Sequence, residues 1–87
     1  IKIPHMGWNE VNISRSVLYK GIKNLSSFYF VHSYHLKPKN KNIISGTSIH
    51  GEILASSIEK DNIFATQFHP EKSHDVGSRL LENFIKI

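Results

Sequence analysis

The sequence predicts a fold made mostly of β-strands, with one helix at the C-terminal end of residues 1–87. Runs of aromatic and β-branched residues alternate with polar residues, which is typical of strands. Glycines and polar turn residues separate these runs. Only the last segment places apolar residues at helical spacing. A chain of 87 residues forms one domain at most, and its core is thin because so short a chain buries only about two-thirds of its unfolded surface.

The first elements are a strand, a helical turn and a second strand. The segment WNEVNI, Trp8–Ile13, alternates in polarity and predicts a strand with one apolar face. Ser14 follows and can cap a short helical turn that ends near Gly21. Aromatic and β-branched residues fill Phe28–Tyr34, which predicts a central strand. The lysine-rich segment KPKNKN after it predicts a solvated loop.

The second half predicts two hairpins and the helix. The segments IISGTS and IHGEILASSIEK indicate two strands, with Gly46 and Gly51 at turns or bulges. Lys60–Asn62 predicts a hairpin turn into the strand IFATQF. Ser73 or Asp75 is the expected N-cap of the final helix. Its apolar stripe, which we expect to face the core, consists of Val76, Leu80, Leu81, Phe84 and Ile85.

Composition excludes several classes of protein. No apolar run approaches the roughly 20 residues that span a bilayer, and the first residues lack the apolar region of a signal peptide. The absence of cysteine excludes disulfides, cysteine-ligated metals and a cysteine nucleophile within these residues, and it fits a cytoplasmic location. The net charge of +4 comes from scattered lysines that form no nucleic-acid stripe. Because the chain starts with Ile1, we expect it to begin inside a longer reading frame.

The residues with the clearest chemical potential are His69, Pro70 and Glu71, at the end of a predicted strand. Pro70 favours an extended His69. Glu71 can then accept a hydrogen bond from one ring nitrogen, which leaves the other nitrogen to act as a base. A surface histidine in a turn is the alternative, and the spacing alone leaves both open. Ser33 as a serine nucleophile for this pair is disfavoured, because it lacks the glycine-flanked turn that exposes such a serine.

The other histidines give no firm site. His32 and His35 would be the pair for a metal site, but no acidic or cysteine partner stands at suitable spacing, so no metal site is predicted. We expect His5, His50 and His74 to be ordinary surface residues. The segment PHMGWNEV is dense in special residues: Trp8 is either a core tryptophan or, with Asn9, part of a partner interface.

Three segments carry a family resemblance. PHMGWNEV, YFVHSY and FATQFHPEKS with the later LLENFI occur in this order in class I glutamine amidotransferases, which the chain resembles over essentially its whole length. More narrowly, it resembles the glutaminase subunits of imidazole glycerol phosphate synthases, from histidine biosynthesis. FHPE is shared by many amidotransferases, whereas PHMGWN together with YFVHSY is more specific. The resemblance implies an α/β fold, of which residues 1–87 form the C-terminal part of one amidotransferase domain.

The resemblance also implies roles for individual residues. The family uses a cysteine–histidine–glutamate triad, in which His69 and Glu71 match the histidine and the glutamate. The cysteine and the oxyanion loop lie upstream in the family, so we expect these 87 residues alone to be inactive. The backbone of Ser33 and Tyr34 would help to hold glutamine. The residues expected to face the (βα)₈ cyclase subunit and the ammonia passage are Trp8, Asn9, Tyr29 and Lys72.

The resemblance implies no metal or organic cofactor, and no nucleic-acid or membrane partner. Two alternatives remain open. A paralogue could supply ammonia for the synthesis of a surface sugar, or the chain could be a non-catalytic remnant that binds a partner. We also expect the isolated residues to associate, because strand edges that lack neighbours invite pairing.

Overall fold

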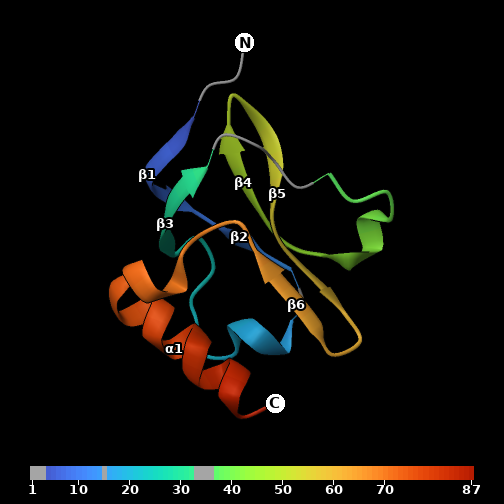
Figure 1. Cartoon of the computed structure of the whole chain (residues 1–87), viewed down its shortest axis with the longest axis vertical. Helices are drawn as coiled ribbons and strands as arrows, with labels where there is room; N and C mark the ends of the chain where they lie inside the picture. The colour runs from blue at the N-terminus through green and yellow to red at the C-terminus, as the bar shows by residue number, and fades with distance from the viewer. Residues whose placement is uncertain (1–3, 15, 33–36) are drawn as a thin grey trace.

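The computed structural model describes residues 4–14, 16–32 and 37–87. As predicted, strands dominate and one helix ends the chain. The strands form a two-stranded sheet, β1–β3, and a four-stranded sheet in the order β2–β4–β5–β6, and every pair is antiparallel. The elements are β1 (His5–Glu10), β2 (Asn12–Ile13), η1 (Val17–Tyr19), β3 (Ser27–His32), η2 (Lys41–Ile43), β4 (Ile44–His50), β5 (Glu52–Lys60), β6 (Ile63–Thr66), η3 (Pro70–Lys72) and α1 (His74–Ile85). In Figure 1, α1 and the C-terminus lie at the bottom of the view, below β1 and β3.

The predicted strand 8–13 is two strands that belong to different sheets. β1 starts earlier than predicted, and the chain changes sheets at Val11, which is fully buried. The N–H of Val11 donates to the carbonyl of Ser26, and its carbonyl accepts from the N–H of Leu25. After this break, β2 pairs with β4. One continuous segment therefore joins the two sheets.

β3 has backbone partners on both edges, as expected for a central strand. One edge pairs with β1, where Tyr29 lies opposite Trp8. On the other edge, the N–H of His69 donates to the carbonyl of Tyr29 at 2.8 Å, and Phe30 forms an isolated bridge with Phe68. The predicted strand extended to Tyr34, and residues 33 and 34 lie outside the described residues.

The two predicted hairpins are confirmed. Gly51, with φ +76°, connects β4 to β5, and Asp61 and Asn62 connect β5 to β6. The register between β4 and β5 shifts on both sides of Gly46. A side chain at Gly46 would crowd the hydroxyls of Ser57 and Tyr19, at 2.7 and 2.9 Å from the added carbon. Gly46 therefore lets the bulged strand lie close to the core.

Ser16 caps the helical turn after β2. The sequence predicts Ser14 in this role, and the structure corrects that prediction. The hydroxyl of Ser16 accepts a hydrogen bond from the N–H of Leu18 at 3.1 Å. At Ser14 the backbone is still paired with the four-stranded sheet, since its N–H donates to the carbonyl of Ser45 in β4, and the turn therefore begins two residues later. The turn directs Leu18 into the buried cluster, which consists of Val11, Leu18, Tyr19, Phe28, Phe30, Phe68 and Leu80.

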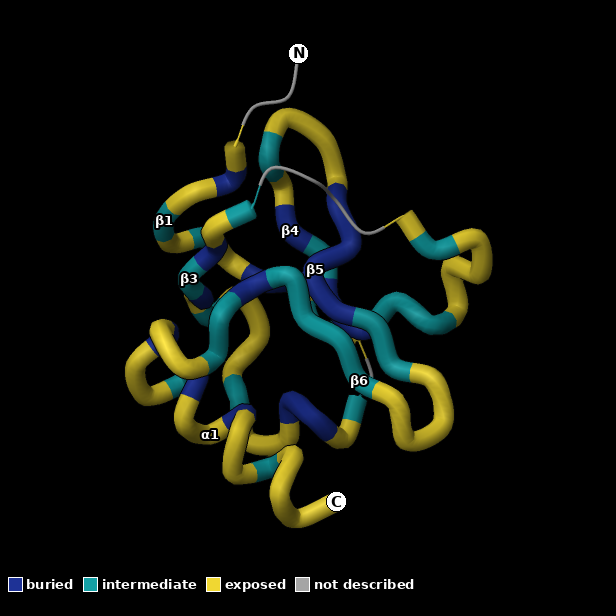
Figure 2. The backbone as a smooth tube through the Cα atoms, viewed as in Figure 1, coloured by how far each residue is buried: buried dark blue, intermediate teal, exposed yellow. Residues whose placement is uncertain are grey.

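The apolar stripe of α1 is only partly core, which corrects the prediction. Leu80 is buried and Val76 packs against the core, whereas Leu81 and Phe84 are exposed and Ile85 is 80% exposed. Figure 2 shows this end of α1 largely as exposed surface. The described residues offer no element to cover it. Among them, no helix is long and apolar enough to cross a membrane.

Candidate active site

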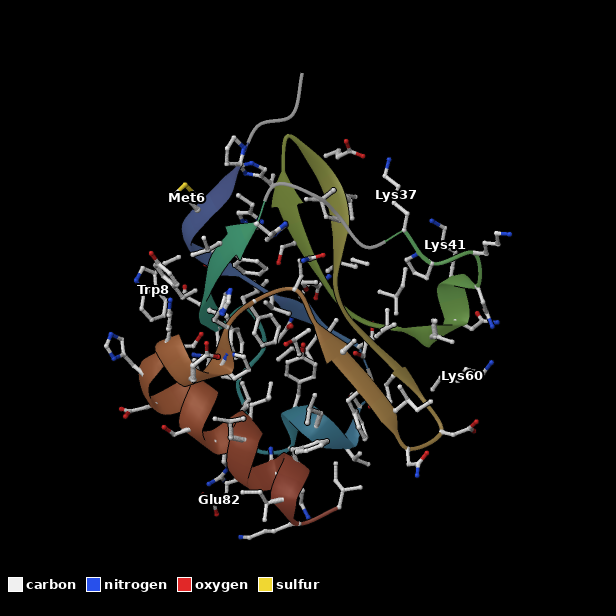
Figure 3. All side chains as sticks on the ribbon, viewed as in Figure 1. Met6, Trp8, Lys37, Lys41, Lys60 and Glu82 are labelled. Carbon is white, nitrogen blue, oxygen red and sulfur yellow. The ribbon has the colours of Figure 1, made fainter. Side chains whose placement is uncertain are left out.

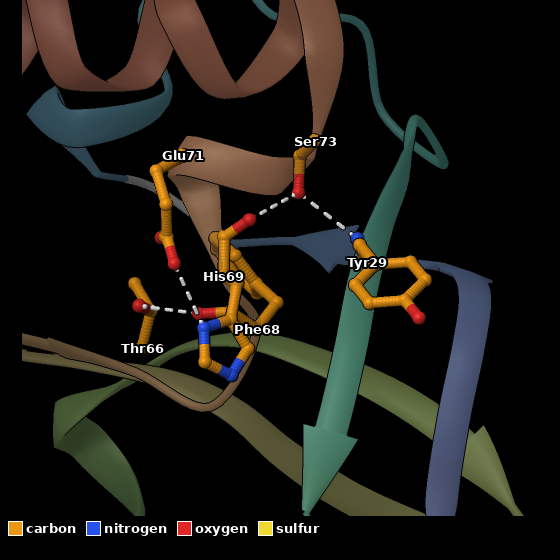
Figure 4. A network of polar contacts seen from close by, with 6 residues as sticks. All are labelled: Tyr29, Thr66, Phe68, His69, Glu71 and Ser73. Atoms are coloured by element: carbon orange, nitrogen blue, oxygen red, sulfur yellow. Dashed lines mark hydrogen bonds and ion pairs between the residues drawn. The ribbon is translucent and has the colours of Figure 1, made fainter.

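His69 and Glu71 meet where the chain leaves the four-stranded sheet. β6 ends at Thr66, and His69 is extended, with φ −103° and ψ 99°, immediately before Pro70 begins η3. Nδ1 of His69 lies 3.0 Å from Oε2 of Glu71, so the predicted hydrogen bond across Pro70 is present (Figure 4). The side chain of His69 is 38% exposed, and another molecule can therefore reach it.

The pair has a defined proton arrangement. The hydrogen bond from His69 is the largest cause that lowers the pKa of the Glu71 carboxyl below its ordinary value of 4.5. An ionised carboxylate only accepts hydrogen bonds, so Nδ1 of His69 carries a proton. In the neutral ring the lone pair is then on Nε2. No described residue hydrogen bonds to Nε2. This nitrogen is thus suited to accept a proton from a nearby nucleophile.

A buried serine holds the backbone of His69. Ser73 is fully buried, and its hydroxyl donates to the carbonyl of His69 at 2.6 Å and accepts from the N–H of Tyr29 at 2.9 Å (Figure 4). Just upstream, the hydroxyl of Thr66 donates to the carbonyl of Phe68 at 3.0 Å. The segment that carries His69 is therefore tied both to β3 and to its own turn.

Close packing of α1 fixes the same segment from the other side. A methyl group added at Gly77 would overlap the carbonyl oxygen of Pro70. The N–H of Gly77 donates to the carbonyl of Ser73 at 3.3 Å. The sequence did not predict the close packing at Gly77 or the role of the Ser73 hydroxyl, which makes no capping bond although Ser73 is the N-cap. The available signal was a glycine inside a helix, where glycine is disfavoured without a packing reason.

The residues expected to face a partner do not all point outward. Trp8 is 48% exposed, which argues against the core alternative, and its ring stacks on His74 at 5.2 Å and meets the edge of Tyr29 at 5.8 Å. Figure 3 shows Trp8 at the outer edge of the molecule, beside the start of α1. Lys72 is exposed on η3. The amide of Asn9, in contrast, bonds within the chain, to His5 and to the carbonyl of Ile49.

His5 is buried, which corrects the prediction of a surface residue. Its ring stacks on Phe30 at 4.1 Å and on His50 at 4.4 Å. His50 is half-buried, also contrary to the prediction, whereas His74 is exposed. The reason is that β1 begins at His5 and not at Trp8, so His5 lies in the sheet opposite His32.

Some predicted residues cannot be placed. Ser33, Tyr34 and His35, to which the glutamine-holding backbone and the serine and metal alternatives were assigned, lie outside the described residues. Within residues 4–14, 16–32 and 37–87, no group of three histidine, aspartate or glutamate side chains could hold a metal ion.

Comparisons with known proteins agree on one family. Residues 1–87 match the family model described as glutamine amidotransferase class-I. The imidazole glycerol phosphate synthase subunit HisH 1 of Campylobacter jejuni (strain RM1221) is 54% identical over 88 residues, which cover 100% of this chain and 43% of that protein. The HisH subunits of Methanocaldococcus jannaschii and Acinetobacter baylyi are 53% and 49% identical, over 99% of this chain and 44% and 43% of theirs. The chain thus spans less than half the length of these relatives. It belongs to the class I glutamine amidotransferase family.

Proposed function

We propose that the chain is the C-terminal portion of the glutaminase subunit of an imidazole glycerol phosphate synthase. This enzyme hydrolyses glutamine to glutamate and ammonia, and passes the ammonia to a cyclase subunit in histidine biosynthesis. The observation that carries the proposal is the 3.0 Å contact between His69 and Glu71. Support also comes from the names of relatives that are about half identical to this chain. A cytoplasmic location is part of the proposal, and no cofactor is required.

In this proposal His69 moves protons and Glu71 orients it. A cysteine thiol gives its proton to Nε2 of His69 and attacks the side-chain amide carbon of glutamine. The imidazolium then protonates the leaving nitrogen, ammonia departs, and a glutamyl thioester remains on the cysteine. Water next attacks the thioester carbonyl and gives a proton to Nε2, and the carbon–sulfur bond breaks to release glutamate while the sulfur regains its proton from the imidazolium. Glu71 keeps the Nδ1 proton in place and stabilises the imidazolium.

The nucleophile must come from elsewhere, because the 87 residues contain no cysteine. We place it in the part of the subunit that precedes the matching segment, together with the oxyanion donors. The backbone at Ser33 and Tyr34 holds the glutamine. Trp8, Tyr29 and Lys72 face the (βα)₈ cyclase subunit, whereas the amide of Asn9 supports β1 from within the chain. A closed passage between the subunits is needed, because ammonia released into water is protonated and loses its nucleophilic lone pair.

A chimera tests this proposal. Residues 1–87 replace the matching segment of the Campylobacter jejuni relative, and glutamine hydrolysis is assayed with that organism's synthase partner. We expect the chimera to hydrolyse glutamine, and the 87 residues alone to be inactive. His69→Asn in the chimera should lower kcat by about 100-fold or more, since general acid–base catalysis contributes 10²–10⁴-fold.

Two glutamates of similar exposure provide a matched control. The side chain of Glu71 is 59% exposed and that of Glu82, on α1, is 54% exposed. Glu71→Gln should lower kcat, whereas Glu82→Gln should not. A His69→Asn chimera with full activity would refute the proposed chemistry. A folded chimera that binds the partner but never hydrolyses glutamine would instead favour the non-catalytic remnant. Formation of cyclised product by the active complex would favour the histidine pathway over the surface-sugar paralogue.

A further inference from the structure

The side chain of Trp8 lies against rings from two other elements. Its indole stacks on the ring of His74, the first residue of α1, with the ring centroids 5.2 Å apart and the planes within 10° of parallel. The ring of Tyr29, opposite Trp8 in the register of β1 and β3, makes a T-shaped contact with the indole at 5.8 Å. Trp8 is still 48% exposed, so the two contacts leave much of the indole open to another molecule.

The rings that contact Trp8 are carried by backbone segments that are joined to each other. Ser73 is fully buried, and its hydroxyl accepts a hydrogen bond from the N–H of Tyr29 at 2.9 Å (Figure 4). His74 follows Ser73 in the chain, and its ring returns to Trp8. The contacts therefore form a closed loop, in which a buried hydrogen bond holds the start of α1 beside β3.

The backbone of His74 alone does not explain why a histidine stands at this position. Its φ is +53°, in the left-handed region that glycine adopts without strain. No described residue hydrogen bonds to the ring of His74, and its aromatic contact is the stack on Trp8. The stack is therefore what the imidazole adds at the start of the helix.

We propose that His74 is a positioning residue that holds the indole of Trp8 in one orientation, ready to contact the cyclase subunit. This inference rests on the proposed function, in which Trp8 faces that subunit. Large aromatic side chains contribute much of the binding energy of protein interfaces, and ordering a mobile side chain on association weakens binding. A tryptophan that is already held in place avoids this cost. His74 thus acts through Trp8 and does not itself need to touch the partner.

The stack can be detected in the 87-residue chain by proton NMR. The imidazole protons of His74 should resonate upfield of the ordinary histidine range, since they lie over the face of the indole, and their signals are identified by their absence in His74→Asn. Trp8→Leu should return these protons to the ordinary range. Ordinary shifts for His74 in the unsubstituted chain would overturn the inference, and that outcome does not depend on the folding of any variant.

The mobility of the indole can be measured by time-resolved fluorescence anisotropy, because Trp8 is the single tryptophan of the 87 residues. His74→Asn removes the ring but suits the left-handed backbone, whereas His74→Phe keeps a ring for the stack. We expect His74→Asn to increase the amplitude of the nanosecond depolarisation at least about twofold, and His74→Phe to leave it near the unsubstituted value. Ser78→Ala, at an exposed position on the same helix, is the control and should change nothing. Equal amplitudes in His74→Asn and Ser78→Ala would overturn the proposed role.

Binding of the chimera to the cyclase subunit tests the consequence for the interface. His74→Asn should raise Kd by about three- to tenfold, the cost of ordering one side chain on association, while His74→Phe stays within about twofold. In a Trp8→Ala background, His74→Asn should have no further effect, because it acts only through the indole. An equal loss with and without Trp8 would show that His74 acts on the partner directly, which would overturn the positioning role.

Failure of this inference and failure of the proposed function give different results. A folded chimera that does not bind the cyclase subunit counts against the proposed function, whereas the spectra of the 87-residue chain still decide whether the stack exists. A chimera that binds the subunit and hydrolyses glutamine, with the same Kd for the unsubstituted and His74→Asn proteins, overturns the positioning role alone.

Discussion

The hydroxyl of Ser73 accepts a 2.9 Å hydrogen bond from the backbone N–H of Tyr29, 44 positions earlier in the chain. The N-cap residue of α1 therefore provides a hydrogen-bond acceptor to the edge of β3 that faces away from β1. The same hydroxyl donates to the carbonyl of His69. One buried serine therefore connects the strand, the helix and the candidate catalytic histidine.

Ser73→Ala should lower the free energy of unfolding by about 1–3 kcal/mol, because it removes the fully buried hydroxyl and leaves the N–H of Tyr29 without its acceptor. Urea denaturation of the chain measures this change. Ser78→Ala is the control, since Ser78 is an exposed residue of the same helix. Equal losses in the two variants would show that the Ser73 hydroxyl is not what stabilises this junction.

Gly77→Ala should also destabilise the fold, by about 3 kcal/mol. In an ordinary helix interior, replacing glycine by alanine stabilises by roughly 1 kcal/mol, so the sign of the effect is the test. The expected loss arises because the added methyl group would overlap the carbonyl oxygen of Pro70 and push η3 away from α1. Thermal unfolding of the two proteins decides the sign. A more stable alanine variant would mean that η3 moves aside without cost.

The features that the sequence predicted correctly depend on neighbours in the chain. The turn at Asp61, the connection at Gly51 and the contact across Pro70 each involve residues no more than a few positions apart. Local backbone preferences determine such features, and residue types report them directly. The position of β3 was also predictable, because its aromatic and β-branched residues suit a strand buried between neighbours.

The features that the sequence did not predict depend on distant partners. The sequence predicts His5 at the surface because its strand pattern starts at Trp8, and only the pairing with His32 places His5 in the sheet. Ser16 caps the turn in place of Ser14 because the backbone of Ser14 is still paired with Ser45 of β4, so the chain turns two residues later. Periodicity predicts which residues share the apolar face of α1. It does not predict how many of those residues another element covers.

Removing the ring nitrogens of His69 should raise the pKa of the Glu71 carboxyl back toward 4.5. The depressed pKa in the folded chain means that this carboxylate stabilises the fold above pH 4.5. That contribution is lost as the pH falls below 4.5 and through the lower pKa of the folded state. A ¹³C titration of the carboxyl in the unsubstituted and His69→Phe chains measures the shift.

Glu82 is an internal control in the same titration. Its pKa is also lowered, mainly by the hydrogen bond from Lys86. His69→Phe should leave the Glu82 titration unchanged while the Glu71 titration moves up. Parallel movement of both carboxyls would indicate a general change in the fold, and an unmoved Glu71 would show that the contact with His69 does not persist in solution.

The isolated 87 residues should associate as their concentration rises. Leu81, Phe84 and Ile85 expose an apolar strip on α1, and such strips drive self-association in water. Ile85→Lys should shift the sedimentation profile toward monomer. Glu82→Lys changes the charge of the same helix without removing apolar surface, so it should have a smaller effect. A chain that sediments as a monomer and melts cooperatively at high concentration would contradict this expectation.

Lys72→Ala should uncouple glutamine hydrolysis from cyclisation in the two-subunit chimera. Lys72 is exposed on η3, directly after Glu71, and in the proposed complex it faces the cyclase subunit. A carboxylate of that subunit would be a natural partner. An exposed pair contributes no more than about 1 kcal/mol, so its loss should alter the fit of the two subunits more than their affinity. A looser contact lets ammonia escape before it reaches the second site.

The measurement is the ratio of glutamate formed to cyclised product. We expect this ratio to rise in Lys72→Ala, while KM for glutamine stays within about twofold, because the lysine makes no contact in the proposed chemistry of His69. Lys60→Ala is the matched control: Lys60 is an exposed lysine at the end of β5, and Figure 3 shows it on the opposite side of the molecule from Trp8. If both variants keep the unsubstituted ratio, Lys72 is an ordinary solvated charge on a turn. If both raise it equally, the leak comes from loss of positive charge in general and not from this junction.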